Sequence, residues 1–451
     1  MSESCQVAIR QAEKQRELIF RAADWLWKHP ETGYKEWQTH AFLKAEYEKL
    51  GYTLVEAGNI PGFYTEIDTG RPGPTVLIMA EMDALIVESH PSCDPETKAV
   101  HACGHCCQSA GLLGVAAALK EPGALDGLSG RIRLMEVPAE EAIEIDFRED
   151  LRKQGVIRYF GGKQEFLARG MMEGVDIVTL IHTSVRASGT ADATPGSNGF
   201  LLKSYTFRGK SAHAASPWSG VNALYAATQA LSAINAVRET FEDSDHIRVH
   251  PIITKGGTVV NAIPEEVTVE NYIRGASLDA IEKADERVSR ALAGSALSMG
   301  ANVSLRSRPG YLPQKNDPAL CALALDAAEL VLGEGKAEMR KTWGNGCSDM
   351  GDMTALFPTA YLHIGGAKGK GHGADYDVSD TESLCVGSAK ILMAFLQKLL
   401  ENGAAEAKKV VASYQPVFQS REDYCKAMDA MIRDGDAIEY NEDGTATVRW
   451  K

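Results

Sequence analysis

Apolar residues in the first part of the chain form short runs separated by helical patterns. The run at residues 75–80 is apolar on both faces of an extended chain, and similar runs follow at 132–137 and 175–181. Between the first two, residues 112–119 are rich in alanine and leucine, which favours a helix. This alternation predicts an α/β fold with a mostly parallel central sheet and helices on both faces.

The pattern changes after a turn-rich stretch at residues 195–199. Residues 202–209 and 266–274 alternate between apolar and polar side chains, as strands with one buried face do. Residues 222–241 and 279–297 have apolar positions at helical spacing. These elements predict an inserted α+β domain of about 110 residues.

The sheet pattern returns near the end of the chain. The apolar run 359–364 predicts another strand, and an amphipathic helix over 380–400 is expected to stop at Asn402-Gly403. The polar tail predicts a small hairpin around Glu442-Asp-Gly444. The expected domains are a main domain over 1–196 and 310–405, an inserted domain over 197–309, and a C-terminal extension over 406–451.

Composition narrows the class of protein. The net charge of −14 argues against a nucleic-acid partner. No fully apolar stretch reaches the roughly 18 residues of a membrane span, and the polar N-terminal segment does not resemble a signal peptide. We therefore expect a cytoplasmic protein without a membrane partner, whose nine cysteines are reduced thiols or ligands.

The stretch His101-Ala-Cys103-Gly-His105 carries the most informative chemistry, a thiol and an imidazole two residues apart. Carboxyl ends of parallel strands meet at one edge of a sheet, where ligands gather. Four polar residues are expected at that edge: Asp83, Glu140, Glu141 and His182. A cysteine, histidines and paired carboxylates together indicate a borderline divalent metal with one carboxylate acting as a base.

A redox protein is the main alternative, because Cys103-Gly-His-Cys106 also spells a dithiol pattern. Its context is poor, since a third thiol follows at Cys107 and the chain is far longer than a thioredoxin-like domain. The redox interpretation also leaves the glutamate pair and the later histidines unexplained. Small buried core cysteines are the remaining alternative for either thiol alone.

Motifs over roughly residues 15–402 resemble the M20 metallopeptidase family, in the amidohydrolase branch of aminoacylase-like, auxin-conjugate and aminobenzoyl-glutamate hydrolases. In chain order they are His29-Pro-Glu-Thr-Gly33, Glu81-Met-Asp83, His101-Ala-Cys-Gly-His105, Pro138-Ala-Glu-Glu141, Ile181-His182, Gly209-Lys-Ser-Ala-His213, Asn261-Ala-Ile-Pro264, Ile273-Arg274, Ser348-Asp-Met-Gly-Asp352 and His372.

The resemblance implies a zinc-peptidase-like catalytic domain with two divalent metal ions, for which Zn, Mn or Co would fit. It also implies a base, Glu140, that deprotonates the metal-activated water, and Asp83 as a residue that orients a ligand. The implied metal ligands, with Cys103 as the bridging one, are Cys103, His105, Glu141, His182 and His372.

The resemblance further implies that the inserted domain is a lid and dimerisation domain. His213 would cross the interface of a homodimer and stabilise the oxyanion, with Asn261 as a second polar contact and Arg274 on the substrate carboxylate. A surface histidine, a turn asparagine and a solvated arginine are the alternative interpretations of these three residues.

The sequence therefore predicts hydrolysis of the amide bond of a small N-acyl amino acid, an aminobenzoyl-glutamate-like conjugate or a dipeptide. The alternatives are the redox protein that uses Cys103 and Cys106, and a non-catalytic member of the family that only binds. Three residues depart from the usual pattern of the branch: Glu81, Cys106 and Gln108.

Overall fold

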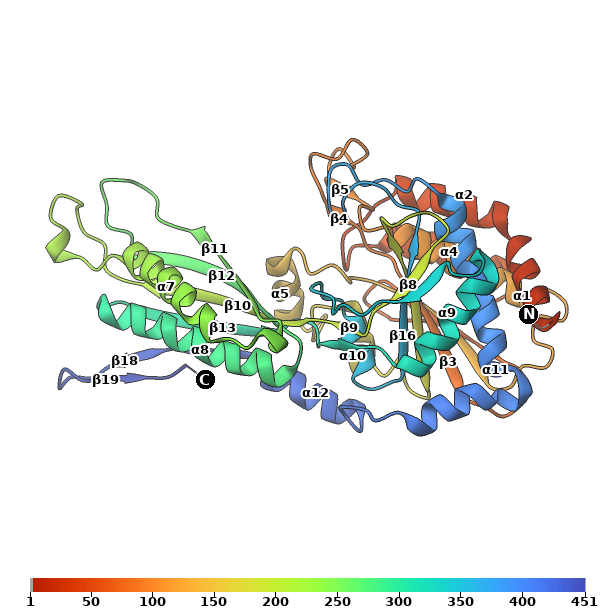
Figure 1. Cartoon of the computed structure of the whole chain (residues 1–451). Helices are drawn as coiled ribbons and strands as arrows, with labels where there is room; N and C mark the ends of the chain where they lie inside the picture. The colour runs from red at the N-terminus through yellow and green to blue at the C-terminus, as the bar shows by residue number, and fades with distance from the viewer. Residues whose placement is uncertain (1–2, 451) are drawn as a thin grey trace. The chain divides into compact units, whose positions relative to one another are not determined.

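The computed structural model describes residues 3–450, which form two compact units (Figure 1). Unit 1 contains the chain up to Gly196 together with Lys315–Gly344 and Ser348–Arg421. Unit 2 contains Ser197–Gln314, Asn345–Cys347 and the chain from Glu422 onward. Unit 2 is therefore an insertion into unit 1 that also recruits the C-terminal tail.

Unit 1 is built on an eight-stranded sheet with a parallel centre. The pairs β6–β3, β3–β7 and β7–β16 are parallel, whereas β2 pairs with β6 in the antiparallel sense. In sheet order the strands are β1 (Val55–Glu56), β2 (Phe63–Asp68), β6 (Arg131–Val137), β3 (Thr75–Glu81), β7 (Ile177–Ser184), β16 (Thr359–Gly365), β8 (Ala191–Ala193) and β15 (Ala337–Met339).

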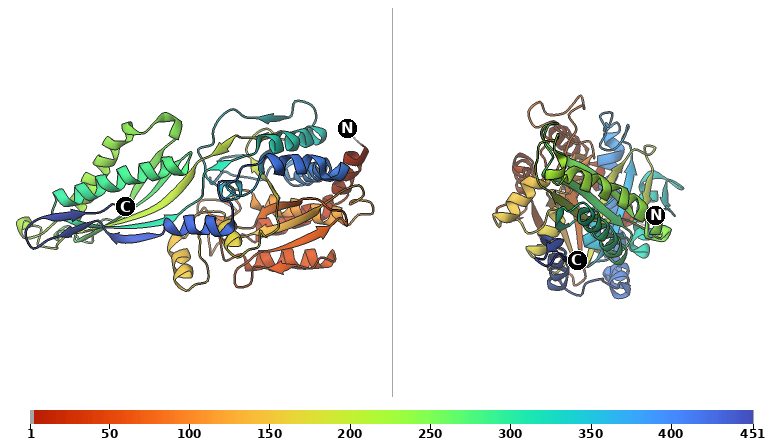
Figure 2. Two further views of the ribbon diagram at one scale, coloured as in Figure 1. Left: turned by 90° about the horizontal axis from the view of Figure 1, so that it is seen from below. Right: turned by 90° about the vertical axis from the view of Figure 1, so that its left-hand side faces the viewer.

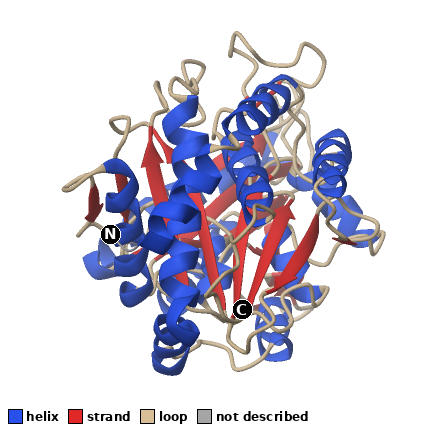
Figure 3. Ribbon diagram, turned by 90° about the vertical axis from the view of Figure 1, so that its right-hand side faces the viewer, coloured by secondary structure: helices blue, strands red, loops and turns tan. Residues whose placement is uncertain are grey.

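Helices cover both faces of this sheet (Figure 3), which confirms the predicted fold class. All residues of α4 are buried, which explains why its sequence is apolar on every side. The helices of unit 1 are α1 (Glu3–Glu13), α2 (Arg16–Lys28), α3 (Trp37–Lys49), α4 (His105–Leu119), α5 (Ile145–Lys153), α6 (Gly162–Ala168), α9 (Pro318–Leu332), α10 (Met350–Thr354) and α11 (Ser388–Ser413).

Helix α11 breaks where the sequence predicts a helix end. Asn402 and Gly403 have φ angles of 53° and 69°, the left-handed conformation typical of a C-cap, and a second helical segment then runs to Ser413. The helical stretch Glu382–Ser413 contains one 18-residue window apolar enough to cross a membrane. Because 89% of that window is buried inside the protein, it has the surroundings of a core helix.

Unit 2 is an antiparallel sheet with helices on one face (Figure 2). Alternate side chains of its strands, such as Tyr205, Phe207, Val267 and Val269, form the core with the helices. In order the strands are β11 (Arg248–Lys255), β12 (Glu266–Gly275), β10 (Gly199–Arg208), β13 (Asn302–Pro309) and β17 (Arg433–Asp436), and the helices are α7 (Ala223–Val237) and α8 (Leu278–Ser298).

The C-terminal tail is divided between the two units. Its first part continues α11 in unit 1, and α12 (Arg421–Ala430) then leads to β17, which pairs with β13. Ala437 and Ile438 are buried in the core of unit 2. The predicted hairpin is confirmed and consists of β18 (Ile438–Tyr440) and β19 (Ala446–Val448).

A buried carboxyl group in β6 makes the stability of unit 1 depend on pH. Glu136 is fully buried and accepts hydrogen bonds from Ser109 Oγ at 2.7 Å and Tyr47 Oη at 3.2 Å. Burial raises the pKa of Glu136 to about 8 from an ordinary value of 4.5, although the two hydroxyl groups act in the opposite direction. Between pH 4.5 and about 8, the folded chain therefore keeps a proton on Glu136 that the unfolded chain releases.

We predict that the free energy of unfolding falls between pH 5 and 8, with Glu136 contributing at most about 1.4 kcal/mol per pH unit. Glu136→Gln should flatten this slope because it removes the titrating group. Urea unfolding at several pH values measures the effect, with the exposed Glu17→Gln variant as the control. Equal slopes for wild type and Glu136→Gln would contradict the prediction.

Candidate metal centre

The predicted ligands converge at the carboxyl edge of the parallel strands of unit 1. Asp83 follows β3, the Glu140-Glu141 pair follows β6, and Cys103 lies just before α4. The expected end of the third strand at residue 181 is wrong, because β7 runs to Ser184 and His182 therefore lies within it. The main-chain pairing of β7 with β16 extends the strand past that residue.

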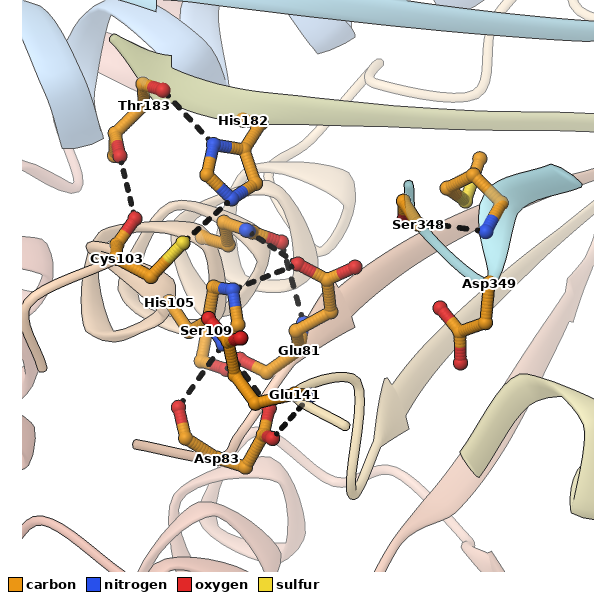
Figure 4. Close-up of polar contacts among 12 residues, drawn as sticks. Glu81, Asp83, Cys103, His105, Ser109, Glu141, His182, Thr183, Ser348 and Asp349 are labelled. Atoms are coloured by element: carbon orange, nitrogen blue, oxygen red, sulfur yellow. Dashed lines mark hydrogen bonds and ion pairs between the residues drawn. The ribbon is translucent and has the colours of Figure 1, made fainter. Parts of the chain in front are cut away.

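Two histidines are oriented by hydrogen bonds to one ring nitrogen. His105 Nδ1 lies 3.0 Å from both the backbone oxygen and Oδ1 of Asp83, and His182 Nδ1 lies 2.8 Å from the backbone oxygen of Thr183 (Figure 4). When Nδ1 carries the proton, Nε2 is the nitrogen that can bind a metal. His182 Nε2 lies 3.4 Å from Cys103 Sγ.

Glu141 and His372 complete the set from two different segments. His372 Nε2 lies 3.3 Å from Glu141 Oε1, and the backbone N–H of Glu141 donates to Asp83 Oδ2 at 2.8 Å. The backbone N–H of His372 donates to the oxygen of Ala102 at 2.9 Å, which fixes its loop beside the thiol segment. Asp83 therefore holds both an imidazole and the segment that carries Glu141.

These donor atoms form overlapping groups, each small enough to hold one cation. The donor atoms of Cys103, His105 and His182 lie within 4.8 Å of one another, and those of Cys103, Glu141 and His372 do so as well. Cys103 is shared by both groups, which is the arrangement that a bridging ligand requires.

Two buried atoms of this cluster test whether metal ions fit. His105 Nε2 and Glu141 Oε1 are buried and make no hydrogen bond among the described residues. Their contacts are ion pairs, at 3.2 Å between His105 Nε2 and Glu81 Oε2 and at 3.3 Å between Glu141 Oε1 and His372 Nε2. A divalent cation would bind both atoms, which are buried and make no hydrogen bond. Burial also lowers the pKa of His182, which favours the neutral imidazole that a metal needs. The residues present therefore fit a pair of borderline divalent ions.

Glu140 is buried beside this cluster. Carboxylate oxygens of Glu140, Glu81 and Asp349 lie within 4.8 Å of one another. Burial raises the pKa of Glu140, the neighbouring Glu81 and Glu141 raise it further, and Lys163 lowers it. Bound cations would also lower it, since opposite charges favour the ionised form.

Sequence reasoning missed a group of charges next to the predicted ligands. Lys163 is fully buried, and its ammonium lies 2.5 Å from Glu81 Oε1 and also contacts Asp349. Burial alone would raise the pKa of Glu81, but Lys163 and His105 lower it to about 2. Asp349 stands in a motif noted in the sequence, but a single lysine such as Lys163 gives no signal that it is buried.

Two departures from the branch pattern are partners in the structure. Gln108 Nε2 donates to Glu81 Oε2 at 2.7 Å, and the backbone N–H of Glu81 donates to Gln108 Oε1 at 3.2 Å. The amide of Gln108 therefore holds the carboxylate of Glu81 in place. The third departure, Cys106, is buried within α4.

Arg148 in α5 is a second missed residue. It is fully buried and donates to the backbone oxygens of Phe160 and Glu141. Its guanidinium lies 5.6 Å from the centre of the Tyr34 ring. Arg148 thus holds the segment that carries Glu141.

The three remaining candidates belong to unit 2. The backbone N–H of Ala214 donates to the oxygen of Asn261 at 3.0 Å, so the segments of His213 and Asn261 are neighbours. Arg274 is the penultimate residue of β12, and its Nη1 lies 3.5 Å from Cys347 Sγ. Its guanidinium also lies 5.8 Å from the centre of the Phe200 ring.

Comparisons with known proteins agree with this geometry. The N-acetyl-L-cysteine deacetylase of Bacillus subtilis is 29% identical over 320 residues, which are 67% of this chain and 70% of that protein. One of the subunits of the p-aminobenzoyl-glutamate hydrolase of Escherichia coli is 30% identical over 316 residues, which are 66% of each protein.

Among solved structures, a Bacillus subtilis protein described as a dinuclear metal-binding peptidase of the M20 family shares the fold. It has a TM-score of 0.64 and 22% identity, and the match covers 84% of this chain and 96% of that protein. The model of peptidase family M20/M25/M40 matches residues 77–398, well over half of the chain. The chain therefore belongs to peptidase family M20, as its motifs predict.

Proposed function

We propose that this M20 hydrolase cleaves the amide bond of a small N-acyl amino acid, an aminobenzoyl-glutamate-like conjugate or a dipeptide. One observation carries the proposal: five side chains from distant segments bring their donor atoms together beside the buried carboxylate of Glu140. A binding protein that does no chemistry has no need of a positioned base next to a complete ligand set.

Two divalent ions, Zn, Mn or Co, would be held by the cluster around the shared thiol of Cys103. The residues that would hold them are Cys103, His105, Glu141, His182 and His372. When bound, such ions act as Lewis acids that polarise a carbonyl oxygen and make water more acidic. Asp83 keeps the imidazole of His105 in the tautomer that such an ion requires.

Glu140 is the residue to which we assign the proton transfers. Its carboxylate takes a proton from the attacking water and returns it to the nitrogen of the leaving amine. Glu140 and Glu141 are consecutive residues, so one can serve as a ligand while the other faces the substrate. Burial around Glu140 limits the access of bulk water and strengthens electrostatic interactions in the site.

The substrate class rests on two observations. The curated relatives are named for hydrolysis of an N-acetyl amino acid and of an aminobenzoyl-glutamate conjugate. Substrates of this kind carry a carboxylate, for which a planar guanidinium such as that of Arg274 is suited. Asn261 would add a polar contact.

A homodimer is also part of the proposal, with His213 acting on the oxyanion of the partner's substrate. Unit 2 exposes large apolar side chains, including Trp218 at 82% and Val260 at 100%, as surfaces that are covered in an assembly do. All nine cysteines are free thiols, which supports the proposed cytoplasmic location.

The redox alternative is weaker than the hydrolytic proposal. Cys106 is buried, and a hydrogen bond with Cys107 together with burial raises its pKa. A reactive redox pair needs a lowered thiol pKa and access for its partner.

The direct test is a screen of N-acyl amino acids, aminobenzoyl-glutamate and dipeptides with protein reconstituted with Zn, Mn or Co. We predict hydrolysis by wild type, and a loss of kcat of about 100- to 10,000-fold in Glu140→Gln with its metal content unchanged. Glu136→Gln, another buried carboxyl group of the same sheet, should keep wild-type kcat. Full turnover by Glu140→Gln would end the proposed role of this residue.

A mixing experiment tests the homodimer and the role of His213 across it. Glu140→Gln and His213→Ala should each be inactive, because each lacks one required group. If the two groups come from different subunits, a mixed dimer contains one intact site. Equal mixtures should then recover about a quarter of wild-type activity. No recovery after confirmed subunit exchange would show that His213 does not act in the partner's site.

A further inference from the structure

A buried ammonium group lies among three buried carboxylates next to the candidate metal centre. Lys163 comes from α6, Glu81 from the end of β3, and Asp349 precedes α10. Lys163, Glu81 and Asp349 each have 0% exposure, and Lys163 Nζ contacts a carboxylate oxygen of both partners. The backbone N–H of Lys163 also donates to Asp349 Oδ2 at 3.0 Å.

The three carboxylates form a group that by composition would suit a cation. Oxygen atoms of Glu81, Glu140 and Asp349 lie within 4.8 Å of one another. Burying such charges without a compensating charge is strongly unfavourable. The covalently attached ammonium of Lys163 supplies a positive charge that cannot exchange with the solvent.

The two oxygen atoms of Glu81 have different partners. Oε1 contacts Lys163, whereas Oε2 accepts a hydrogen bond from Gln108. Oε2 also lies 3.2 Å from His105 Nε2 (Figure 4). His105 is held from its other side by Asp83. If the Glu81 carboxylate rotated, it would no longer lie beside Nε2 of His105, the nitrogen that would face a metal ion.

We propose that Lys163 is a positioning residue for the hydrolytic reaction. It forms ion pairs with both Glu81 and Asp349. These contacts fix the carboxylate of Glu81 beside His105 and Glu140. The inference rests on the proposed function, because it assigns the reaction to the site that Glu140 and the ligand cluster form. Lys163 itself touches neither the five proposed ligands nor, in this role, the substrate.

The test compares Lys163→Met with Lys203→Met. Lys203 is a matched control, because its Nζ forms another buried ion pair with Asp285, at 2.8 Å, within unit 2. Both variants replace a buried ammonium by an apolar side chain of similar length. The measurements are kcat and KM with a substrate found in the screen, and the visible absorption spectrum of the Co²⁺-loaded protein.

We predict that Lys163→Met lowers kcat by about 100-fold, because a displaced carboxylate disturbs the reacting geometry. KM should change by less than about threefold, since Lys163 does not contact the substrate. The Co²⁺ spectrum should also change, because His105 loses a fixed neighbour. Lys203→Met should keep wild-type kcat and the wild-type spectrum. A folded Lys163→Met variant with both properties unchanged would overturn the proposal.

A second variant keeps the proposal testable if Lys163→Met does not fold. The triple variant Lys163→Met, Glu81→Gln, Asp349→Asn removes the ammonium together with both of its ion-pair partners, so that neither partner is left as an unpaired charge. It should fold, bind Co²⁺ with an altered spectrum and retain the low kcat. If the triple variant had wild-type kcat and a wild-type spectrum, Lys163 would serve only to compensate buried charge in the folded protein. That result would overturn its proposed positioning role.

Failure of the proposed function gives a different result. If wild type hydrolyses no compound in the screen, the substrate assignment fails for every variant. The spectra of Co²⁺-loaded wild type, Lys163→Met and Lys203→Met still report whether Lys163 orders the centre. An altered spectrum in Lys163→Met alone would support the positioning role, and three identical spectra would overturn it.

Discussion

Burial of many charged groups at one edge of a sheet constrains the whole of unit 1. Glu81, Asp83 and Glu140 are all buried there, and an unpaired carboxylate in such surroundings is strongly unfavourable. The structure compensates with the ammonium of Lys163 beside Glu81, and His105 Nδ1 lies 3.0 Å from Asp83 Oδ1. A pair of divalent cations would supply the remaining positive charge. The chemistry and the stability of this edge therefore depend on the same set of contacts.

The parallel sheet makes this arrangement possible. Strands β3, β6 and β7 run side by side in one direction, so the segments that follow them deliver side chains to a single edge. Helix α4 starts at that edge with His105 and is packed on all sides, which leaves its first turn little freedom. Buried, rigid elements on both sides hold the donors within a few ångströms of one another.

The sequence predicted the parts of the site that local patterns encode. Strands buried on both faces appear as apolar runs, and polar residues after them, such as Asp83 and Glu141, mark the functional edge. The pairing of Lys163 with Glu81 and Asp349 could not be predicted in this way. These residues lie 82 and 186 positions apart, and a lysine between glycines and glutamine has no periodic signal. Burial of a charge depends on tertiary partners, which one sequence does not display.

The C-terminal tail also contains a strand that local sequence patterns do not predict. Its hairpin follows from local spacing, but the pairing of β17 with β13 depends on a distant strand edge. Every residue of β17 is exposed. Its sequence therefore lacks the alternation of apolar and polar residues that would predict a strand. Its main-chain hydrogen bonds with β13, together with side-chain contacts of Asp436 with Arg208 and of Asp434 with Arg308, tie it to unit 2.

In the proposed site, donors from distant segments would enclose two cations around the thiol of Cys103. Anomalous diffraction at the zinc edge from crystals grown with Zn²⁺ tests it most directly. We predict two anomalous peaks, each about 2.3 Å from Cys103 Sγ. The other ligands, His105, His182, Glu141 and His372, should be distributed between the two peaks. A single peak away from Cys103, or no peak at all at this edge of the sheet, would contradict it.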